Sequence, residues 1–203
     1  MTGSECLQIL RDIKDVAFAT VDEEGKPQVR IIDIMLVEEN RVYFCTARGK
    51  DFYRQLIRTQ EVAVTGMNSA YQMVRLWGRA RRVMEQKYWI DRIFEENPSM
   101  KEVYPKDSRS ILEAFYIESG TLEFFDLGKM PVFRESYVLG QAPEQRKGFQ
   151  ISSGCIGCGT CQQVCPQQCI KEGMPYRINE VHCLHCGLCY ENCPVGAVER
   201  MGE

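Results

Sequence analysis

Residues 155–194 read CIGCGTCQQVCPQQCIKEGMPYRINEVHCLHCGLCYENCP, and the rest of the chain is best interpreted from this stretch. It contains one pattern twice, Cys-x2-Cys-x2-Cys-x3-Cys-Pro, with the second copy 28 residues after the first. The cysteines of the first copy are Cys155, Cys158, Cys161 and Cys165, and those of the second are Cys183, Cys186, Cys189 and Cys193. Gly159 and Pro166 recur in the same way, as Gly187 and Pro194.

The residue type and the spacing indicate iron–sulfur clusters. Thiolates are soft ligands, and this spacing with a trailing proline is typical of a chain that binds two clusters. Three close cysteines bind one cluster, whereas the chain carries the fourth cysteine to the other cluster. We therefore predict two [4Fe–4S] clusters. The first is assigned to Cys155, Cys158, Cys161 and Cys193, and the second to Cys165, Cys183, Cys186 and Cys189.

Two other interpretations of the cysteines are a zinc ribbon and a disulfide framework. Zinc needs four ligands, usually as two distant Cys-x2-Cys pairs, which leaves the third and fourth cysteine of each copy unexplained. Disulfides require a secreted protein, and the amino terminus has no apolar signal segment.

The cysteine-rich segment resembles the bacterial 2[4Fe–4S] ferredoxins over residues 148–203. In such proteins the position of Cys169 usually holds a small packing residue, so we expect Cys169 to act as a small hydrophobe.

Composition limits the remaining possibilities. The net charge of −3 gives no reason to expect nucleic acid or an anionic membrane surface as a partner. No apolar run reaches the length that spans a bilayer. Eleven cysteines, eight of them expected as thiolate ligands, favour a reducing cytoplasm in an organism or niche low in oxygen.

The first two thirds of the chain alternate short strands with helices. A helix capped by Ser4 and a further helix capped by Asp51 and ending at about Thr59 are predicted from capping and periodicity. A third, amphipathic helix is expected over Gln86–Asn97, and a short one over Ser108–Leu112. The predicted strands are 16–21, 28–37, 41–46, 61–67, 71–84, 114–118 and 121–126, with Ser119-Gly120 as the turn between the last two.

These elements predict a mainly β, α+β fold: a small barrel followed by a small ferredoxin-like domain with two clusters. We place the barrel in residues 1–127 and the ferredoxin domain in residues 148–203. Residues 128–147 gather Gly and Pro among charges, which is the composition of a linker. Its segment Pro131–Leu139 is apolar enough to pack on the barrel.

The barrel resembles the FMN-binding split barrels of the pyridoxamine 5′-phosphate oxidase-like superfamily over roughly residues 5–127. The matching pieces are Phe18–Val21 with Gly25–Arg30, Val42–Thr46 with Gly49-Lys50, Glu61–Val64, and Leu76–Ala80. The resemblance implies FMN, held at the interface of a homodimer. It also implies that Arg30, Thr46 and Lys50 contact the flavin, mainly its phosphate. The vitamin-oxidising members carry a different segment after the barrel, so pyridoxamine phosphate is not the expected substrate.

The chemistry of these residues agrees with an anion site. Lys50 precedes a helix amino terminus, where backbone N–H groups favour a phosphate. Further contacts implied by the resemblance are Ile31, Ile32 and Asp33 alongside the flavin, Cys45 in the same strand as Thr46, and Arg75 and Trp77 reaching across the dimer. Four of the predicted flavin contacts have a plainer alternative. Arg30 and Lys50 could be solvated strand or surface residues, and Cys45 and Trp77 could be core residues.

The combination predicts an FMN-dependent oxidoreductase in which the clusters relay single electrons to FMN, which reduces a small organic substrate. An external low-potential electron carrier would load the clusters. The alternatives are an electron-transfer protein without a small-molecule substrate, and a redox sensor. No catalytic acid or base can be named, and the nicotinamide fingerprint Gly-x-Gly-x-x-Gly is absent.

Overall fold

A computed structural model describes residues 1–143 and 146–202. Its backbone divides into two compact units, which are considered separately. The first unit consists of Met1–Ser69, Met73–Glu123 and Tyr137–Pro143, and the second of Ala70–Gln72, Phe124–Ser136 and Glu144–Glu203. The segment expected as a linker thus contributes residues to both units and contains a strand, β8 (Phe133–Leu139).

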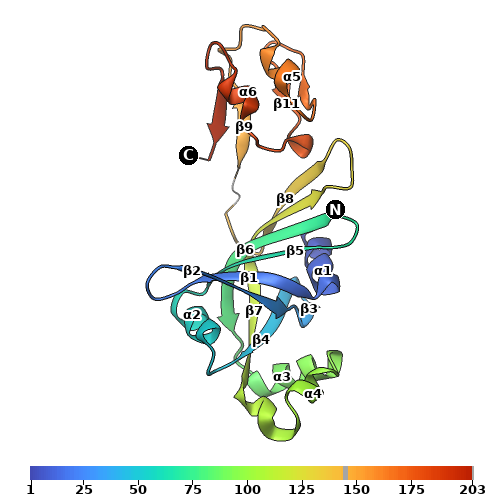
Figure 1. Ribbon diagram of the computed structural model, residues 1–203, viewed down its shortest axis with the longest axis vertical. Coiled ribbons are helices and arrows are strands. Elements are labelled where there is room, and N and C mark those ends of the chain that lie inside the picture. The colour runs from blue at the N-terminus through green and yellow to red at the C-terminus, as the bar shows by residue number, and fades with distance from the viewer. Residues whose placement is uncertain (144–145, 203) are drawn as a thin grey trace. The chain divides into compact units, whose positions relative to one another are not determined.

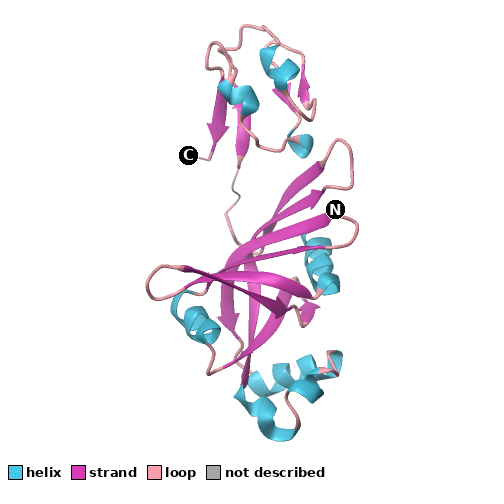
Figure 2. Ribbon diagram, viewed as in Figure 1, coloured by secondary structure: helices cyan, strands magenta, loops and turns pink. Residues whose placement is uncertain are grey.

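The fold is mostly β with some helices, as predicted (Figure 2). The helices up to residue 111 are α1 (Gly3–Ile13), α2 (Asp51–Thr59), α3 (Gln86–Glu96), α4 (Met100–Val103) and a 3-10 turn at Lys106–Ile111. The strands of the large sheet are β1 (Asp15–Val21), β2 (Pro27–Asp33), β3 (Leu36–Glu38), β4 (Arg41–Ala47), β5 (Glu61–Met67), β6 (Gln72–Arg82), β7 (Leu112–Asp126) and β8.

The large sheet curls into a half-barrel (Figure 1). Its strand order is β2-β1-β5-β6-β7-β4-β3, with β8 paired to β7. The two end strands, β2 and β3, are consecutive in the chain and separated by only two residues. The Ile34 amide donates to Lys14 O at 2.9 Å and the Met35 amide donates to Tyr43 O at 2.8 Å. The sheet must curl because this short connection brings its two ends together.

Aromatic side chains fill the interior of the half-barrel. Phe18 of β1 lies 4.8 Å from Phe44 of β4, between ring centroids, and Phe52 of α2 packs on both rings at 5.9 Å. Phe44 also stacks on Phe115 of β7 at 5.7 Å. Because these aromatic rings bury large apolar areas, they hold α2 against the sheet. This packing fixes the start of α2, where the flavin phosphate is expected.

Four expectations about the elements need correction. Asp51 is the first residue of α2 and not its cap, since Lys50 holds the capping position. Helix α1 is capped by Thr2, not Ser4, because Thr2 and Glu5 form a reciprocal capping box. The predicted strand 28–37 breaks into β2 and β3 where the chain crosses between the sheet ends.

The predicted strands 114–118 and 121–126 are one strand, β7, without a turn. A Cβ at Gly120 would lie 2.1 Å from Trp77 O, and one at Gly78 would lie 2.5 Å from Ser119 O. Gly120 therefore serves the close approach of β6 to β7, and not a turn.

The second unit carries the cysteine-rich segment, coloured orange to red in Figure 1. Its elements are β9 (Gly148–Ile151), α5 (Thr160–Val164), β10 (Ile170–Lys171), β11 (Arg177–Ile178), a 3-10 turn (Glu180–His182), α6 (Leu188–Glu191) and β12 (Val198–Met201). Strand β9 pairs with β12, and β10 with β11. The small core combines Phe149, Ile170 and Val198 with buried cysteines. Among the described residues, no helix has the length and apolar character to cross a membrane.

Candidate metal centre and flavin site

The structure gathers the cysteines into two groups of four around separate cavities. The first cavity is lined by Cys155, Cys158, Cys161 and Cys193, together with apolar residues and Tyr176. The second is lined by Cys165, Cys183, Cys186 and Cys189, and also by Cys169. Each group takes three cysteines from one copy of the repeat and one from the other, which is the same division that the sequence predicts. The role of these residues as ligands remains a prediction.

Two glycines place the third cysteine of each copy. Gly159 and Gly187 adopt φ of 77° and 84°, which places them in the left-handed region as the residues before α5 and α6. A residue with a Cβ is strained there, so glycine allows the chain to turn around the cavity. Cys161 and Cys189 follow two residues later and are buried. The repeat thus reproduces the same local geometry twice.

The thiols differ in how readily they lose their protons. Burial raises the pKa of Cys189 to about 11 and raises the pKa values of Cys161 and Cys183. Hydrogen bonds from Thr160 lower the pKa of the exposed Cys158. Because ligands must be thiolates, binding of iron has to displace protons from the buried thiols.

Among the described residues, no three His, Cys, Asp or Glu side chains converge closely enough to hold a single metal ion. Thiolates of a [4Fe–4S] cluster bind different irons at its corners, so each cluster takes four cysteines. The two predicted sets of four cysteines match that ligand number.

Arg30 of β2, predicted to bind the phosphate, lies beside α2. Its guanidinium donates to Thr20 Oγ1 at 2.6 Å and to Gln55 Oε1 at 2.9 Å, and it stacks 4.7 Å above the ring of Phe52. Thr20 belongs to β1, whereas Gln55 and Phe52 belong to α2. Arg30 therefore links the sheet to the first turns of α2 and places a positive charge there.

Thr46 carries the clearest sign that a polar group belongs in the barrel site. It is 2% exposed, and its Oγ1 has no hydrogen-bond partner among the described residues. A buried hydroxyl without a partner costs free energy of about 1–3 kcal/mol. Lys50 precedes α2, and no side chain caps this helix. An orphaned hydroxyl, an uncapped helix start and the cations Lys50 and Arg30 fit a phosphate group.

Cys45 and Asp33 lie near one another. Burial and the charge of Asp33 raise the pKa of Cys45 to about 12, and Lys50 acts in the opposite direction. Cys45 belongs to a hydrophobic cluster with Val83 and Ala114, where it packs as a small apolar residue. Burial and the adjacent Asp15 raise the pKa of Asp33. The flavin contacts predicted for Cys45 and Asp33 remain predictions.

Ile31, Arg75 and Trp77 lie on the outer face of the sheet, because strand register alternates side chains between faces. Ala17 pairs with both Ile31 and Thr65, and Thr65 pairs with Arg75. The neighbouring row runs Val29, Ala19, Ala63, Trp77. Ile32 and Arg30 point to the opposite face. The predicted flavin residues thus fall into one group around α2 and another on the outer face.

A buried charge network lies beside Thr46, and no pattern in the sequence predicts it. Glu113 of β7, 5% exposed, pairs with Thr46 in register and accepts two hydrogen bonds from Arg82. Arg48 lies 3.6 Å from the same carboxylate, and Tyr53 donates to it at 3.2 Å. These partners, Arg82 first, lower the pKa of Glu113. The charges of Arg82 and Arg48 exceed that of the one carboxylate, so the net charge beside the predicted phosphate position is positive.

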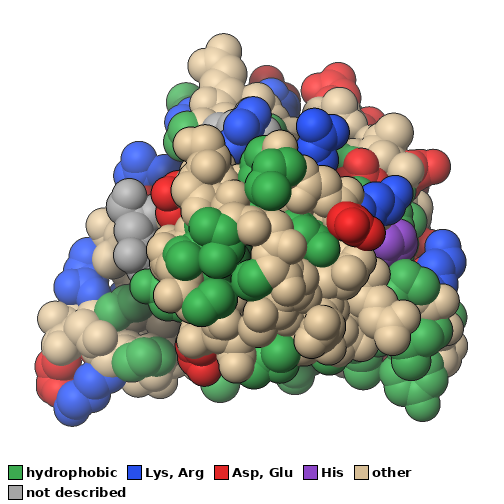
Figure 3. All heavy atoms as spheres, turned by 90° about the horizontal axis from the view of Figure 1, so that it is seen from above, with side chains coloured by type: hydrophobic (Ala, Val, Ile, Leu, Met, Phe, Trp, Pro, Cys, Tyr) green, Lys and Arg blue, Asp and Glu red, His purple; other side chains and the backbone are tan. Residues whose placement is uncertain are grey.

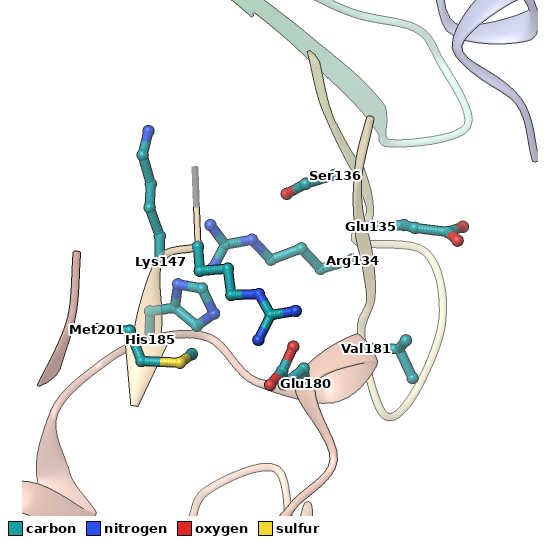
Figure 4. A pocket seen from close by; sticks show the side chains of 9 residues that line it. Arg134, Glu135, Ser136, Lys147, Glu180, Val181, His185 and Met201 are labelled. Carbon is teal, nitrogen blue, oxygen red and sulfur yellow. The ribbon is translucent and has the colours of Figure 1, made fainter. Parts of the chain in front are cut away.

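A hollow in the second unit also lay outside the predictions (Figure 4). Arg134, Arg146, Lys147 and His185 contribute to its lining, together with Glu180. Arg134 and His185 point toward one another, whereas Glu135 points away. The sequence signal was weak, because Arg146 and Lys147 belong to the expected linker.

The chain is similar to known proteins in two separate parts. Residues 3–114 match the family model described as pyridoxamine 5′-phosphate oxidase, and residues 147–199 match that of a 4Fe-4S dicluster domain. A ferredoxin of Butyribacterium methylotrophicum is 44% identical over 35 residues, which cover 17% of this chain and 64% of that ferredoxin. The match therefore leaves about a third of that protein uncovered.

Solved structures resemble the barrel part. A nimC/nimA family protein of Clostridium acetobutylicum is 23% identical, with a TM-score of 0.58, and the match covers 66% of this chain and 90% of that one. An FMN-binding protein related to pyridoxamine 5′-phosphate oxidase, from Nostoc punctiforme, is 12% identical, with a TM-score of 0.51 and coverage of 68% and 93%. These likenesses show the fold. Because the family model matches more than half of this chain, the chain belongs to the pyridoxamine 5′-phosphate oxidase family, and it carries a 4Fe-4S dicluster domain after the barrel.

Proposed function

We propose that the protein is an FMN-dependent oxidoreductase that receives single electrons through two [4Fe–4S] clusters of its own chain. The observation that carries the proposal is that the eight predicted ligand cysteines line two cavities in groups of four, on the same chain as a flavin-family barrel. Clusters carry one electron at a time, whereas a flavin accepts electrons singly and delivers two. The fusion therefore suits the two-electron reduction of a small organic substrate.

In this proposal FMN binds with its phosphate at the start of α2. Thr46 Oγ1 donates to the phosphate and thereby gains a hydrogen-bond partner, while Lys50 and Arg30 supply positive charge. The backbone of Ile31, Ile32 and Asp33 would contact the flavin. When bound, FMN supplies the hydride-transfer chemistry, and the chain's residues hold and orient it.

The outer face of the sheet supports a homodimer. Val29 and Ile31 are 72% and 62% exposed, and they share this face with Val21, Met67 and Trp77. A contiguous apolar face of this kind is rarely left in water. A second copy of the chain is the occupant that the family relationship favours, and it would bring Arg75 and Trp77 to the partner's flavin.

The test of the function is anaerobic electron entry. The intact chain should contain about eight irons and one FMN, and a low-potential reductant that acts through the clusters should reduce the FMN rapidly. The double variant Cys158→Ser/Cys186→Ser should keep FMN and lose this rapid phase. Equal rates in both proteins would contradict the proposal.

Turnover separates the oxidoreductase from its rivals. An oxidoreductase oxidises its reduced FMN with a small-molecule acceptor in steady state, whereas an electron-transfer protein does so only with a redox protein. A redox sensor sustains neither reaction. A panel of small organic acceptors, supplied with continuously reduced carrier, therefore decides among the three.

The homodimer has its own test. Ile31→Glu places a charge on the outer face and should shift the sedimentation mass from about twice the 23.4 kDa of the chain toward one chain. The matched control is Ile57→Glu on α2, since Ile57 is also exposed but lies off this face. A wild-type monomer that retains FMN would contradict the interface.

A further inference from the structure

The two cysteine motifs differ at one buried position next to the cavities. Cys169 follows Cys165 by four residues, and Ala197 follows Cys193 by four residues. The 28-residue repeat therefore relates Cys169 to Ala197. Both are buried, at 6% and 4% exposure, and each lines the cavity of its own group. The second group thus has a fifth sulfur where the first has a methyl group.

This fifth sulfur contacts a predicted ligand. The Sγ of Cys169 lies 3.5 Å from the Sγ of Cys165, within hydrogen-bonding reach for sulfur. Cys165 as an iron ligand is a thiolate and has no proton to donate, so the S–H of Cys169 is the donor. In the first group of cysteines the related contact comes from the backbone, where the Ala197 amide donates to Cys193 Sγ at 3.2 Å. At this place the second group of cysteines has a side-chain donor, whereas the first group has the methyl group of Ala197.

We propose that Cys169 is a positioning residue that raises the reduction potential of the second cluster by donating a hydrogen bond to Cys165. The inference rests on the proposed function, since it needs both clusters. A reduced cluster carries one more negative charge than an oxidised one, so a donor to a ligating sulfur stabilises the reduced form more. Because Cys169 is buried, water does not replace its hydrogen bond. The effect biases a shared electron toward the second cluster.

The repeat contains a second difference, in which the first group has the side-chain donor and the second group does not. This difference is a useful control. Thr160 Oγ1 lies 3.4 Å from Cys158 Sγ in the first motif, and the related residue in the second motif is Leu188. Cys158 is exposed. Water can therefore take the place of the Thr160 hydroxyl. Removal of that hydroxyl should change the potential of the first cluster only slightly, whereas removal of the Cys169 thiol should change the potential of the second cluster more.

The experiment is an anaerobic redox titration of the full iron-loaded chain, followed by electron paramagnetic resonance. Cys169→Ala should lower one of the two potentials by an amount equal to about a tenfold change in the one-electron equilibrium, which is about 59 mV. Cys169→Ser restores a donor and should return that potential to the wild-type value or above. Ala197→Cys should raise the other potential, and Thr160→Val should shift it only slightly.

Several results would overturn the inference. Unchanged potentials in Cys169→Ala, or equal values for the Ala and Ser variants, would show that Cys169 only fills space. Loss of half the iron in Cys169→Ala would show that it holds the cluster instead of tuning it. A failure of the proposed function can be distinguished from a failure of this inference. In that case the wild-type chain would contain fewer than about eight irons before any variant is titrated.

Discussion

The cysteine segment and the barrel encode their sites in opposite ways. In the segment, the eight predicted ligands lie within 39 residues, between Cys155 and Cys193, and each group takes its fourth cysteine from the other copy of the repeat. In the barrel, the predicted phosphate contacts come from β2, β4 and the start of α2, which meet only because the sheet curls. A site within one loop can be recognised from spacing alone, whereas a site between strands depends on the whole topology.

The largest expected effect tests the segment. Cys158→Ser and Cys186→Ser should each reduce the iron content from about eight to about four, because a hydroxyl replaces a soft thiolate poorly. Iron analysis of anaerobically prepared protein measures this, and Cys6→Ala, in α1, is the matched control. Full iron in either variant, or zinc in its place, would refute the ligand assignment.

The next effect tests the barrel site. Thr46→Val removes a hydroxyl while keeping the shape, and it should weaken FMN binding by about tenfold to a hundredfold, since hydrogen bonds to charged groups contribute about 1.5–3 kcal/mol. Thr46→Ser keeps the hydroxyl and should bind like wild type. Fluorescence titration of the flavin-free protein gives both affinities. Equal affinity of the Val and Ser variants would remove Thr46 from the site.

Glu113→Gln probes the network that supports the barrel site. The lowered pKa of Glu113 means that its ion pairs stabilise the fold above its ordinary pKa of 4.5, and that this stabilisation is lost as the pH falls through the lowered value. The variant should therefore lose about 2 kcal/mol at pH 7, and less in acid. Both tryptophans, Trp77 and Trp89, lie in the first unit, so their fluorescence follows its unfolding. A difference that grows toward low pH would contradict the assignment.

The smallest effect tests a purely local signal in the barrel. Thr2→Ala removes the hydroxyl that accepts from the Glu5 amide at 3.2 Å and should cost about 1 kcal/mol. Ser4→Ala is the matched control, because Ser4 is not the cap. Urea unfolding followed by tryptophan fluorescence measures both. If the Ser4 variant were the less stable one, the capping box would not form in solution.

Local patterns in the sequence predicted what depends on neighbours along the chain. The strand Glu61–Met67 is confirmed residue by residue, and the helix predicted to end at Thr59 forms as α2, although Asp51 is its first residue and not its cap. Ser119-Gly120 was wrongly predicted as a turn, because the reason for Gly120 is the Trp77 carbonyl of another strand. The periodicity of a sequence cannot predict a contact between two strands that lie far apart in the chain.

The same distinction applies to the sites. The grouping of the cysteines followed from the repeat, and the cavities agree with it. Glu113 was missed because its partners, Arg48, Tyr53 and Arg82, are brought to it by three different elements. The sequence predicts Cys169 to be a small hydrophobe, like Ala197. The 3.5 Å distance between the Sγ atoms of Cys169 and Cys165 indicates a different role for Cys169.

The backbone of Val132, in the second unit, should make iron loading detectable at a distance from the cysteines. The amide of Val132 donates to Gln167 at 3.0 Å, and its carbonyl lies 2.8 Å from Nδ1 of His182. Gln167 is two residues after Cys165, and His182 directly precedes Cys183. Both anchors therefore depend on the loops that are expected to wrap the second cluster. Protease cleavage around Met130 should be slow in the iron-loaded protein and fast before loading, which gives a simple measure of maturation during assembly in a cell.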